Sequence, residues 1–402
     1  MSAHEAQRRF ASAVTLTCCF VASALEGFDI ASVGIAAPKL APELHLSAQH
    51  LGLVLSGVSI GMFVGALLGG RLADTLGRKA TLVIAIMVIG AFQLGTAFAP
   101  DYLALVVMRV CCGIGIGAAI SNVIALASEA AGPTGSVFNV TFVMAGLPVG
   151  GIVASMIAVA IGEQGDWRAN FYIGGFAPLG LAAIMAFALP ESREFLEIRA
   201  SKPAVRTAAG FLATFFDRGH ALTTLWLWVS YFMTSVILYV LVNWTPTLIA
   251  LKGFSKTQAA SVGLPIGVGG VIGPILIGRL IQRQRSPGLM LLCYAGVVAG
   301  LIGLAQAGHE FATAFIAIAV SAGLIQAASF TLAGLAPLFY PTQFRGTGTG
   351  AAVGVARLGA ICGPATVGFL ISTGLSPGEV LCSLIPIACV AGLTSYMLLQ
   401  DR

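Results

Sequence analysis

The chain has 402 residues, of which 57% are hydrophobic and only 9% are charged. Soluble domains are about a quarter charged, so this composition excludes a water-soluble protein and predicts one whose partner is the lipid bilayer. The net charge of +5 does not form a basic stripe with interleaved aromatic residues, which excludes a nucleic-acid partner.

Twelve apolar stretches are long enough to cross a bilayer, which requires about 20 residues each. In chain order they are Ala11–Ala37, His50–Gly70, Ala80–Phe98, Tyr102–Ala127, Ser136–Ala160, Asn170–Leu189, Leu222–Leu248, Gln258–Leu280, Gly288–Gln306, Phe311–Pro337, Gly346–Thr373 and Glu379–Gln400. We therefore expect an all-α membrane protein with twelve transmembrane helices. A long charged connector predicts an N-terminal six-helix half (1–190), a cytoplasmic linker (191–221) and a C-terminal six-helix half (222–402).

The basic residues predict the orientation of the chain in the membrane. If the N-terminus is cytoplasmic, most Lys and Arg residues fall in cytoplasmic segments, and only Lys39, Arg168, Lys252 and Lys256 fall in outer ones. We therefore expect a multi-pass protein of the cell inner membrane with both termini in the cytoplasm.

The connector between the second and third stretches has the form G-x-x-x-D-x-x-G-R-K. Gly70 and Gly77 allow close helix approach and a tight turn, while Asp74 can pair with basic groups or cap a helix when the inner side is closed. Contacts of this kind must break on opening, so Gly70, Asp74, Gly77 and Arg78 are predicted to form a conformational gate. A related run, Gly278–Leu280, occupies the same place in the second half, as in transporters built from two parallel repeats.

Four charged residues fall inside apolar stretches, where each costs several kcal/mol and needs a reason. Glu26 and Asp29 lie three residues apart on one face of the first helix, and Arg109 lies in the fourth. Arg357 lies in the eleventh, about 15 Å from its start at 1.5 Å per residue, near the midplane.

A carboxyl group removed from water can bind and release a proton near neutral pH, so Asp29 and Glu26 are candidates for proton coupling. A guanidinium group offers a forked donor to a carboxylate, so Arg357 and Arg109 are candidates for substrate binding. The alternative is that these charges pair with one another and only hold the bundle together.

Polar and aromatic residues of the seventh stretch are further candidates. Tyr239, Asn243 and Trp244 recur at helical spacing, and we expect Asn243 and Trp244 to contact the substrate. Gln326 in the tenth stretch is a second buried amide that needs a partner.

No pattern predicts an enzyme. Gly57–Gly61 matches GxSxG but lies inside a helix, and the five His residues fall at helix ends or in connectors. The eight Cys residues have neither disulfide nor metal-ligand spacing. We therefore expect no catalytic residue, no metal and no cofactor, with a proton as the coupling ion.

The Gly70–Lys79 connector resembles the signature of the major facilitator superfamily. Glu26–Asp29, Pro341–Gly348 and Val355–Ala360 resemble motifs of its aromatic acid/proton symporter family, and the likeness is greatest to hydroxyphenylpropionate transporters. The resemblance implies proton-driven uptake of a small aromatic acid by a monomer, with Glu26, Asp29, Arg109 and Arg357 as required charges.

Three positions depart from the family pattern. Thr134 and Gly135 stand where basic residues are usual, Gln282 replaces the acidic residue of the second gating loop, and Glu26 stands where many relatives have Asp. The alternative function is export of drugs or metabolites by proton antiport.

Overall fold

The computed structural model describes residues 3–130, 136–192, 195–196, 221–284, 287–308, 310–340 and 345–400. Their helices are α1 (Ala3–Glu43), α2 (Ala48–Leu76), α3 (Arg78–Ala97), α4 (Tyr102–Ala130), α5 (Ser136–Met144), α6 (Gly146–Ile161), α7 (Arg168–Ala188), α10 (Ala221–Leu251), α11 (Lys256–Ser261), α12 (Gly263–Gln284), α13 (Pro287–Gln306), α14 (Phe311–Leu335), the short 3₁₀ helix η1 (Ala336–Phe339), α15 (Arg345–Ser372) and α16 (Pro377–Gln400). Within this part of the chain, 12 helical spans are long and apolar enough to cross a membrane, which confirms the predicted fold class.

Three of these spans are interrupted near prolines. The fifth span breaks between α5 and α6 at Ala145, three residues before Pro148, and the eighth breaks between α11 and α12 at Val262, three residues before Pro265. The tenth span tightens into η1 at Pro337. Proline has no backbone N–H and its ring crowds the preceding turn, so each break lies just before or at the ring.

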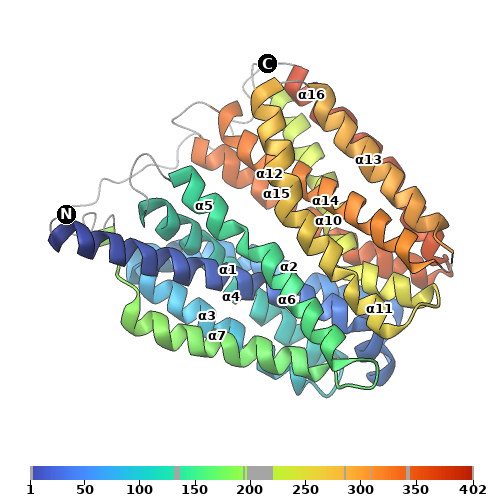
Figure 1. Ribbon diagram of the computed structural model, residues 1–402, viewed down its shortest axis with the longest axis horizontal. Helices are drawn as coiled ribbons and strands as arrows, with labels where there is room; N and C mark the ends of the chain where they lie inside the picture. The colour runs from blue at the N-terminus through green and yellow to red at the C-terminus, as the bar shows by residue number, and fades with distance from the viewer. Residues whose placement is uncertain are drawn as a thin grey trace.

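The two groups of six spans pack by the same scheme. In the first group, α1 packs against α6, α2 against α4, and α3 against both α4 and α7. In the second, α10 packs against α15, α12 against α14, and α13 against both α14 and α16. Each pairing recurs after a shift of six spans, so the repeat seen in the connectors extends to the packing (Figure 1).

Glycines at every fourth position bring α2 and α4 into backbone contact. These glycines of α2 are Gly57, Gly61, Gly65 and Gly69. A Cβ on Gly61 would stand 2.0 Å from the carbonyl oxygen of Val110, and a Cβ on Gly113 would stand 2.2 Å from that of Val58. The GxSxG run is therefore a helix-packing surface, as small residues usually are in membranes.

The halves meet at one end of the bundle and separate at the other. At the end opposite the two termini, the closed side, a Cβ on Gly34 would stand 2.7 Å from the Asn243 carbonyl oxygen, and Ser56 Oγ donates to the carbonyl of Ile361 at 2.8 Å. At the termini side, α5 of one half and α12 of the other diverge (Figure 1).

Some predictions concern residues that the structure does not describe. Thr134, Gly135, the side chain of Gln282 and most of the predicted linker 191–221 lie outside the described residues.

Candidate functional site

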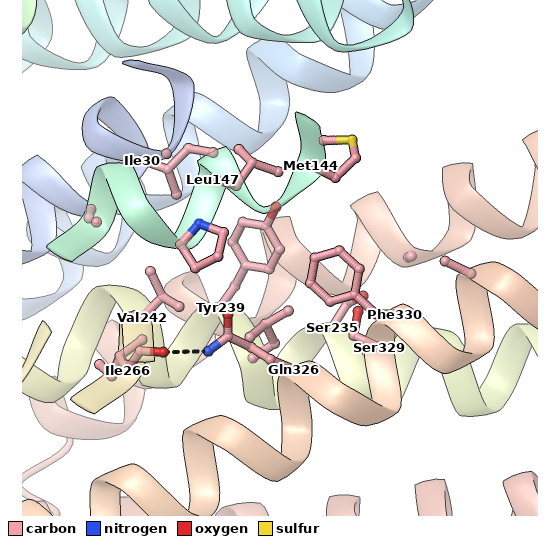
Figure 2. Close-up of a pocket in the computed structure, with 18 of the residues that line it drawn as sticks. Ile30, Met144, Leu147, Ser235, Tyr239, Val242, Ile266, Gln326, Ser329 and Phe330 are labelled. Atoms are coloured by element: carbon pink, nitrogen blue, oxygen red, sulfur yellow. Dashed lines mark hydrogen bonds between the residues drawn. The ribbon is translucent and has the colours of Figure 1, made fainter. Parts of the chain in front are cut away.

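A cavity of about 350 Å³ lies between the two halves. Helices α1, α4, α5 and α6 form one wall, and α10, α12, α14 and α15 form the other (Figure 2). Most of the lining is apolar, including Ile30, Ile120, Met144, Leu147, Leu238, Val242, Ile266, Phe330 and Val353. Its volume falls within the usual range for a small-molecule site, and the apolar lining suits a hydrophobic ligand with few polar groups.

The cavity opens toward the termini side. Ile124, Phe330 and Val353 line it and are 37%, 38% and 36% exposed, and they lie toward the termini-side ends of α4, α14 and α15. The contact between Gly34 and Asn243 closes the other end. A ligand in this cavity therefore has access to one side of the membrane only.

Arg357 is the charged residue of the cavity lining. Its Nη1 donates to the hydroxyl of Tyr239 at 2.8 Å and approaches the sulfur of Met62, across the interface between the halves, at 3.7 Å. Among the described residues Arg357 has no acidic side chain within ion-pair distance, so the rest of its guanidinium fork is available to a ligand. A planar fork of this kind matches the geometry of a carboxylate.

Asp29 and Arg109 form an ion pair inside the first half. Arg109 Nη2 donates to Asp29 Oδ1 at 3.0 Å and to Gln93 Oε1 at 2.9 Å, and the thiol of Cys112 donates to the same Asp29 oxygen at 3.4 Å. Asp29 and Arg109 are fully buried and neither belongs to the cavity lining. Their pairing matches the alternative in which charges hold the bundle together, and their roles in transport remain predictions.

Glu26 differs from Asp29, one turn away. It is fully buried, and neither of its carboxyl oxygens receives a hydrogen bond from the described residues; the nearby Ser23 hydroxyl is also unbonded there. Glu26 immediately precedes Gly27, which lines the cavity, and Arg357 acts on it electrostatically. Burial without hydrogen-bond donors makes the charged form of this carboxyl group costly, and the positive charge of Arg357 offsets part of that cost.

Asn243 and Trp244 lie outside the cavity lining. Asn243 Nδ2 donates to the carbonyl of Tyr239 at 2.9 Å, and Trp244 Nε1 donates to the carbonyl of Pro364 at 3.0 Å. Both side chains are buried, on the closed side of the bundle. Neither residue lines the cavity in this conformation, and their predicted contact with substrate stays a prediction.

The predicted gate residues lie on the termini side. Gly77 adopts φ +96°, which a tight turn requires, whereas a Cβ on Gly70 would meet nothing within 4 Å. Arg78 forms an ion pair with Glu129 at the end of α4. Asp74 is exposed and makes no hydrogen bond or ion pair with a described residue. The interpretation of Asp74 as a contact that breaks on opening fits this splayed arrangement, but its gating role stays a prediction.

A cluster of polar residues next to the α2–α3 turn, formed by Glu129, Glu191 and Ser192, could not be predicted from the sequence. Glu191 Oε1 accepts from the backbone N–H groups of Lys79 and Ser192, both at 2.9 Å, and Ser192 Oγ donates to the Glu129 carboxylate at 2.8 Å. Glu191 lies more than a hundred residues after Lys79, so its approach to the N-terminus of α3 depends on the fold. A carboxylate is stabilised there by the free N–H groups of the helix.

Sequence reasoning also missed Gln93 and Cys112. Gln93 is a lone amide in an apolar stretch, which is a usable signal, while Cys112 resembles any small core residue.

Comparison with known proteins identifies the family. The sequence pattern of the Major Facilitator Superfamily matches residues 19–364. The chain belongs to this superfamily. It is 36% identical over 389 residues to the 3-(3-hydroxy-phenyl)propionate transporter of Escherichia coli (strain K12), covering 97% of this chain and 94% of the relative.

Two further similarities refine the assignment. The major facilitator chain is 33% identical to the 4-hydroxybenzoate transporter PcaK of Pseudomonas putida, over 93% of this chain and 89% of the relative. The crystal structure of a D-xylose-proton symporter superposes with a TM-score of 0.80 over 96% of each chain at 18% identity, which bears on the fold alone. The chain is thus a multi-pass transporter of the aromatic acid group of the superfamily and not an enzyme.

Proposed function

We propose that this major facilitator protein is a proton-coupled symporter that imports an aromatic carboxylate such as a hydroxyphenylpropionate. The observation that carries the proposal is the Arg357–Tyr239 pair, a cation and a hydroxyl set in the wall of an otherwise apolar cavity. The apolar lining suits an aromatic ring, and the guanidinium suits the acid group. Relatives named for hydroxyphenylpropionate and hydroxybenzoate transport support the substrate class.

The orientation follows from the basic residues and from the cavity. With both termini in the cytoplasm of the cell and the chain in its inner membrane, the positive-inside pattern is satisfied. The termini side is then cytoplasmic, and the cavity faces inward, the state from which an importer releases its substrate. The cavity lining comes from both halves of the same chain, an arrangement that is compatible with transport by a monomer.

Protonation of the buried carboxyl groups couples the proton to the acid. Glu26 has no hydrogen-bond partner among the described residues and experiences the charge of Arg357, which supports Glu26 as a carrier of the coupling proton together with Asp29, the carboxylate that pairs with Arg109. A proton on Glu26 removes a negative charge that competes with the substrate carboxylate for Arg357. Binding of proton and acid together lets the halves rock around the loaded site.

The test is uptake into vesicles that contain the purified protein. Labelled 3-(3-hydroxyphenyl)propionate is presented under an imposed inward proton gradient, with and without a protonophore. We expect accumulation that collapses when the protonophore is added. Gradient-driven uptake of a different acid would remove only the named substrate. Flux in the opposite direction would support a proton antiporter, and the absence of any gradient-linked flux of acids would overturn the symporter.

A further inference from the structure

The amide of Gln326 has a fixed orientation in the cavity wall. Its Nε2 donates to the carbonyl of Ile266 at 2.7 Å and to the carbonyl of Ala322 at 3.2 Å. Both partners are acceptors, so only the amide nitrogen can face them, and the amide oxygen must face the other way. Figure 2 shows the bond to Ile266 with Gln326 at the edge of the cavity.

The amide oxygen of Gln326 is an unused acceptor. No described residue donates a hydrogen bond to it. Oε1 is nevertheless not fully buried, and Gln326 lines the cavity. Gly270 leaves room for this oxygen, because a Cβ on Gly270 would stand 2.2 Å from it. An acceptor held in an apolar cavity favours a ligand that brings a donor.

Gln326 and Arg357 lie on different helices of the cavity wall. Gln326 is on α14 and bonds to α12, whereas Arg357 is on α15 and bonds to Tyr239 of α10. In Figure 2 the Tyr239 hydroxyl points toward Met144 and Leu147, away from the Gln326 amide. The two polar groups are thus held by different pairs of helices.

We infer that Gln326 Oε1 accepts a hydrogen bond from a ring hydroxyl of the substrate while Arg357 holds its carboxylate. The inference rests on the proposed function and adds a specificity-determining residue to it. The substrate class is therefore a hydroxylated aromatic acid, since an unsubstituted ring or a methyl ether has no donor for this oxygen. Loss of one such hydrogen bond corresponds to about tenfold in affinity.

The experiment compares two acids that differ only in the ring hydroxyl. Half-saturation concentrations for 3-(3-hydroxyphenyl)propionate and 3-phenylpropionate are measured by vesicle uptake for the wild type and for Gln326→Leu. We expect the wild type to favour the hydroxylated acid about tenfold, and Gln326→Leu to bring the ratio close to one. If Gln326 had a structural role alone, the variant would raise the half-saturation concentrations of both acids equally and leave their ratio unchanged.

Asn122→Leu is the matched control, because Asn122 is another buried amide, bonded to the carbonyl of Ala118 and outside the cavity lining. It should leave the ratio as in the wild type. Gly270→Ala is a second test variant, which keeps Gln326 but displaces its amide oxygen. It tests the role of this oxygen even if Gln326→Leu fails to fold. It too should bring the ratio close to one.

The outcomes separate the two claims. A wild type that takes up both acids with equal half-saturation, or variants that keep the wild-type ratio, overturn the role of Gln326 and leave the symporter standing. A wild type that takes up neither acid overturns the proposed function, and the role of Gln326 with it.

Discussion

At the scale of single residues, the guanidinium of Arg357 lies in the cavity wall without an acidic partner among the described residues. Arg357 uses one donor on the Tyr239 hydroxyl, which fixes the direction of the guanidinium plane. For the proposed acid, the site is thus organised in advance, so binding would require little further ordering of side chains.

This arrangement predicts graded losses at Arg357. Arg357→Gln should raise the half-saturation concentration for the acid by about a hundredfold or more, because the carboxylate loses the one charged partner that the described lining offers. Arg357→Lys should fall between this variant and the wild type, since it keeps the charge but not the fork. Tyr239→Phe should cost only about threefold to tenfold. Concentration-dependent uptake measures all three, and normal uptake by Arg357→Gln would contradict the site.

The two carboxyl groups of α1 should behave differently when neutralised. Asp29→Asn leaves the buried Arg109 without its counter-charge and should lower stability by about 3 kcal/mol, seen as a lower unfolding temperature in detergent. Adding Arg109→Gln to Asp29→Asn should restore part of that loss, because the two residues are coupled. Equal stability of the single and double variants would contradict a structural pair.

Glu26→Gln removes no hydrogen bond donated by a described residue and should leave the unfolding temperature nearly unchanged. It should still exchange labelled for unlabelled acid across the membrane, while concentrative uptake under a proton gradient is lost. Both assays use the same vesicles. Retained accumulation in Glu26→Gln would place the coupling proton elsewhere.

The sequence could predict that Glu26, Asp29, Arg109 and Arg357 matter, because a charge in an apolar stretch is conspicuous. It could not predict which of them pair. Arg109 meets Asp29 across 80 residues, and that contact depends on how α1 and α4 pack. Nor could it predict that the backbone of Asn243 lies against Gly34, while the predicted substrate contact of its side chain stays a prediction.

At the scale of helices, the α2–α4 interface depends on glycine. Gly61→Ala would put a methyl group 2.0 Å from the Val110 carbonyl oxygen, so the helices must separate, at a cost of about 2 kcal/mol. Gly180→Ala in α7 is the control, because a Cβ there meets nothing within 4 Å. Thermal unfolding in detergent should show a lower midpoint for Gly61→Ala only; equal midpoints would contradict the close contact.

Most predicted boundaries lie close to those of the observed spans, and the clear exceptions include positions next to prolines. The first span extends to Glu43, beyond the predicted end at Ala37, because Pro38 and Pro42 are accommodated inside α1. The breaks in the fifth and eighth spans depend on local backbone geometry near Pro148 and Pro265, and hydropathy alone does not reveal them.

At the scale of the whole molecule, the closed side is held by backbone approach between the halves. Gly34→Ala would place its methyl group 2.7 Å from the Asn243 carbonyl oxygen and should shift the population toward the state that is open on this side. Hydrogen–deuterium exchange should then rise in residues 34–46 and 243–256, with Gly180→Ala unchanged. Unaltered exchange in Gly34→Ala would show that this contact does not control closure.

The twelve spans could be predicted from hydropathy because the bilayer demands long apolar helices. The location of the cavity and the side on which it opens could not be predicted in this way. Both depend on the angle between the two six-span halves, which no local sequence pattern reveals. The positive-inside pattern orients the chain but leaves open which side the cavity faces.

The roles proposed for Glu26 and Arg357 also have an electrical consequence. In the proposed cycle an ionised Glu26 balances the positive charge of Arg357 in the empty carrier, and the acid anion balances it in the loaded carrier, where Glu26 is protonated. With one proton per monovalent acid, the reorienting carrier has no net charge in either direction, so a membrane voltage, which acts at about 2.3 kcal/mol per charge for each 100 mV, does no work on it. Uptake should therefore follow the pH difference and ignore a potassium diffusion potential imposed at constant pH.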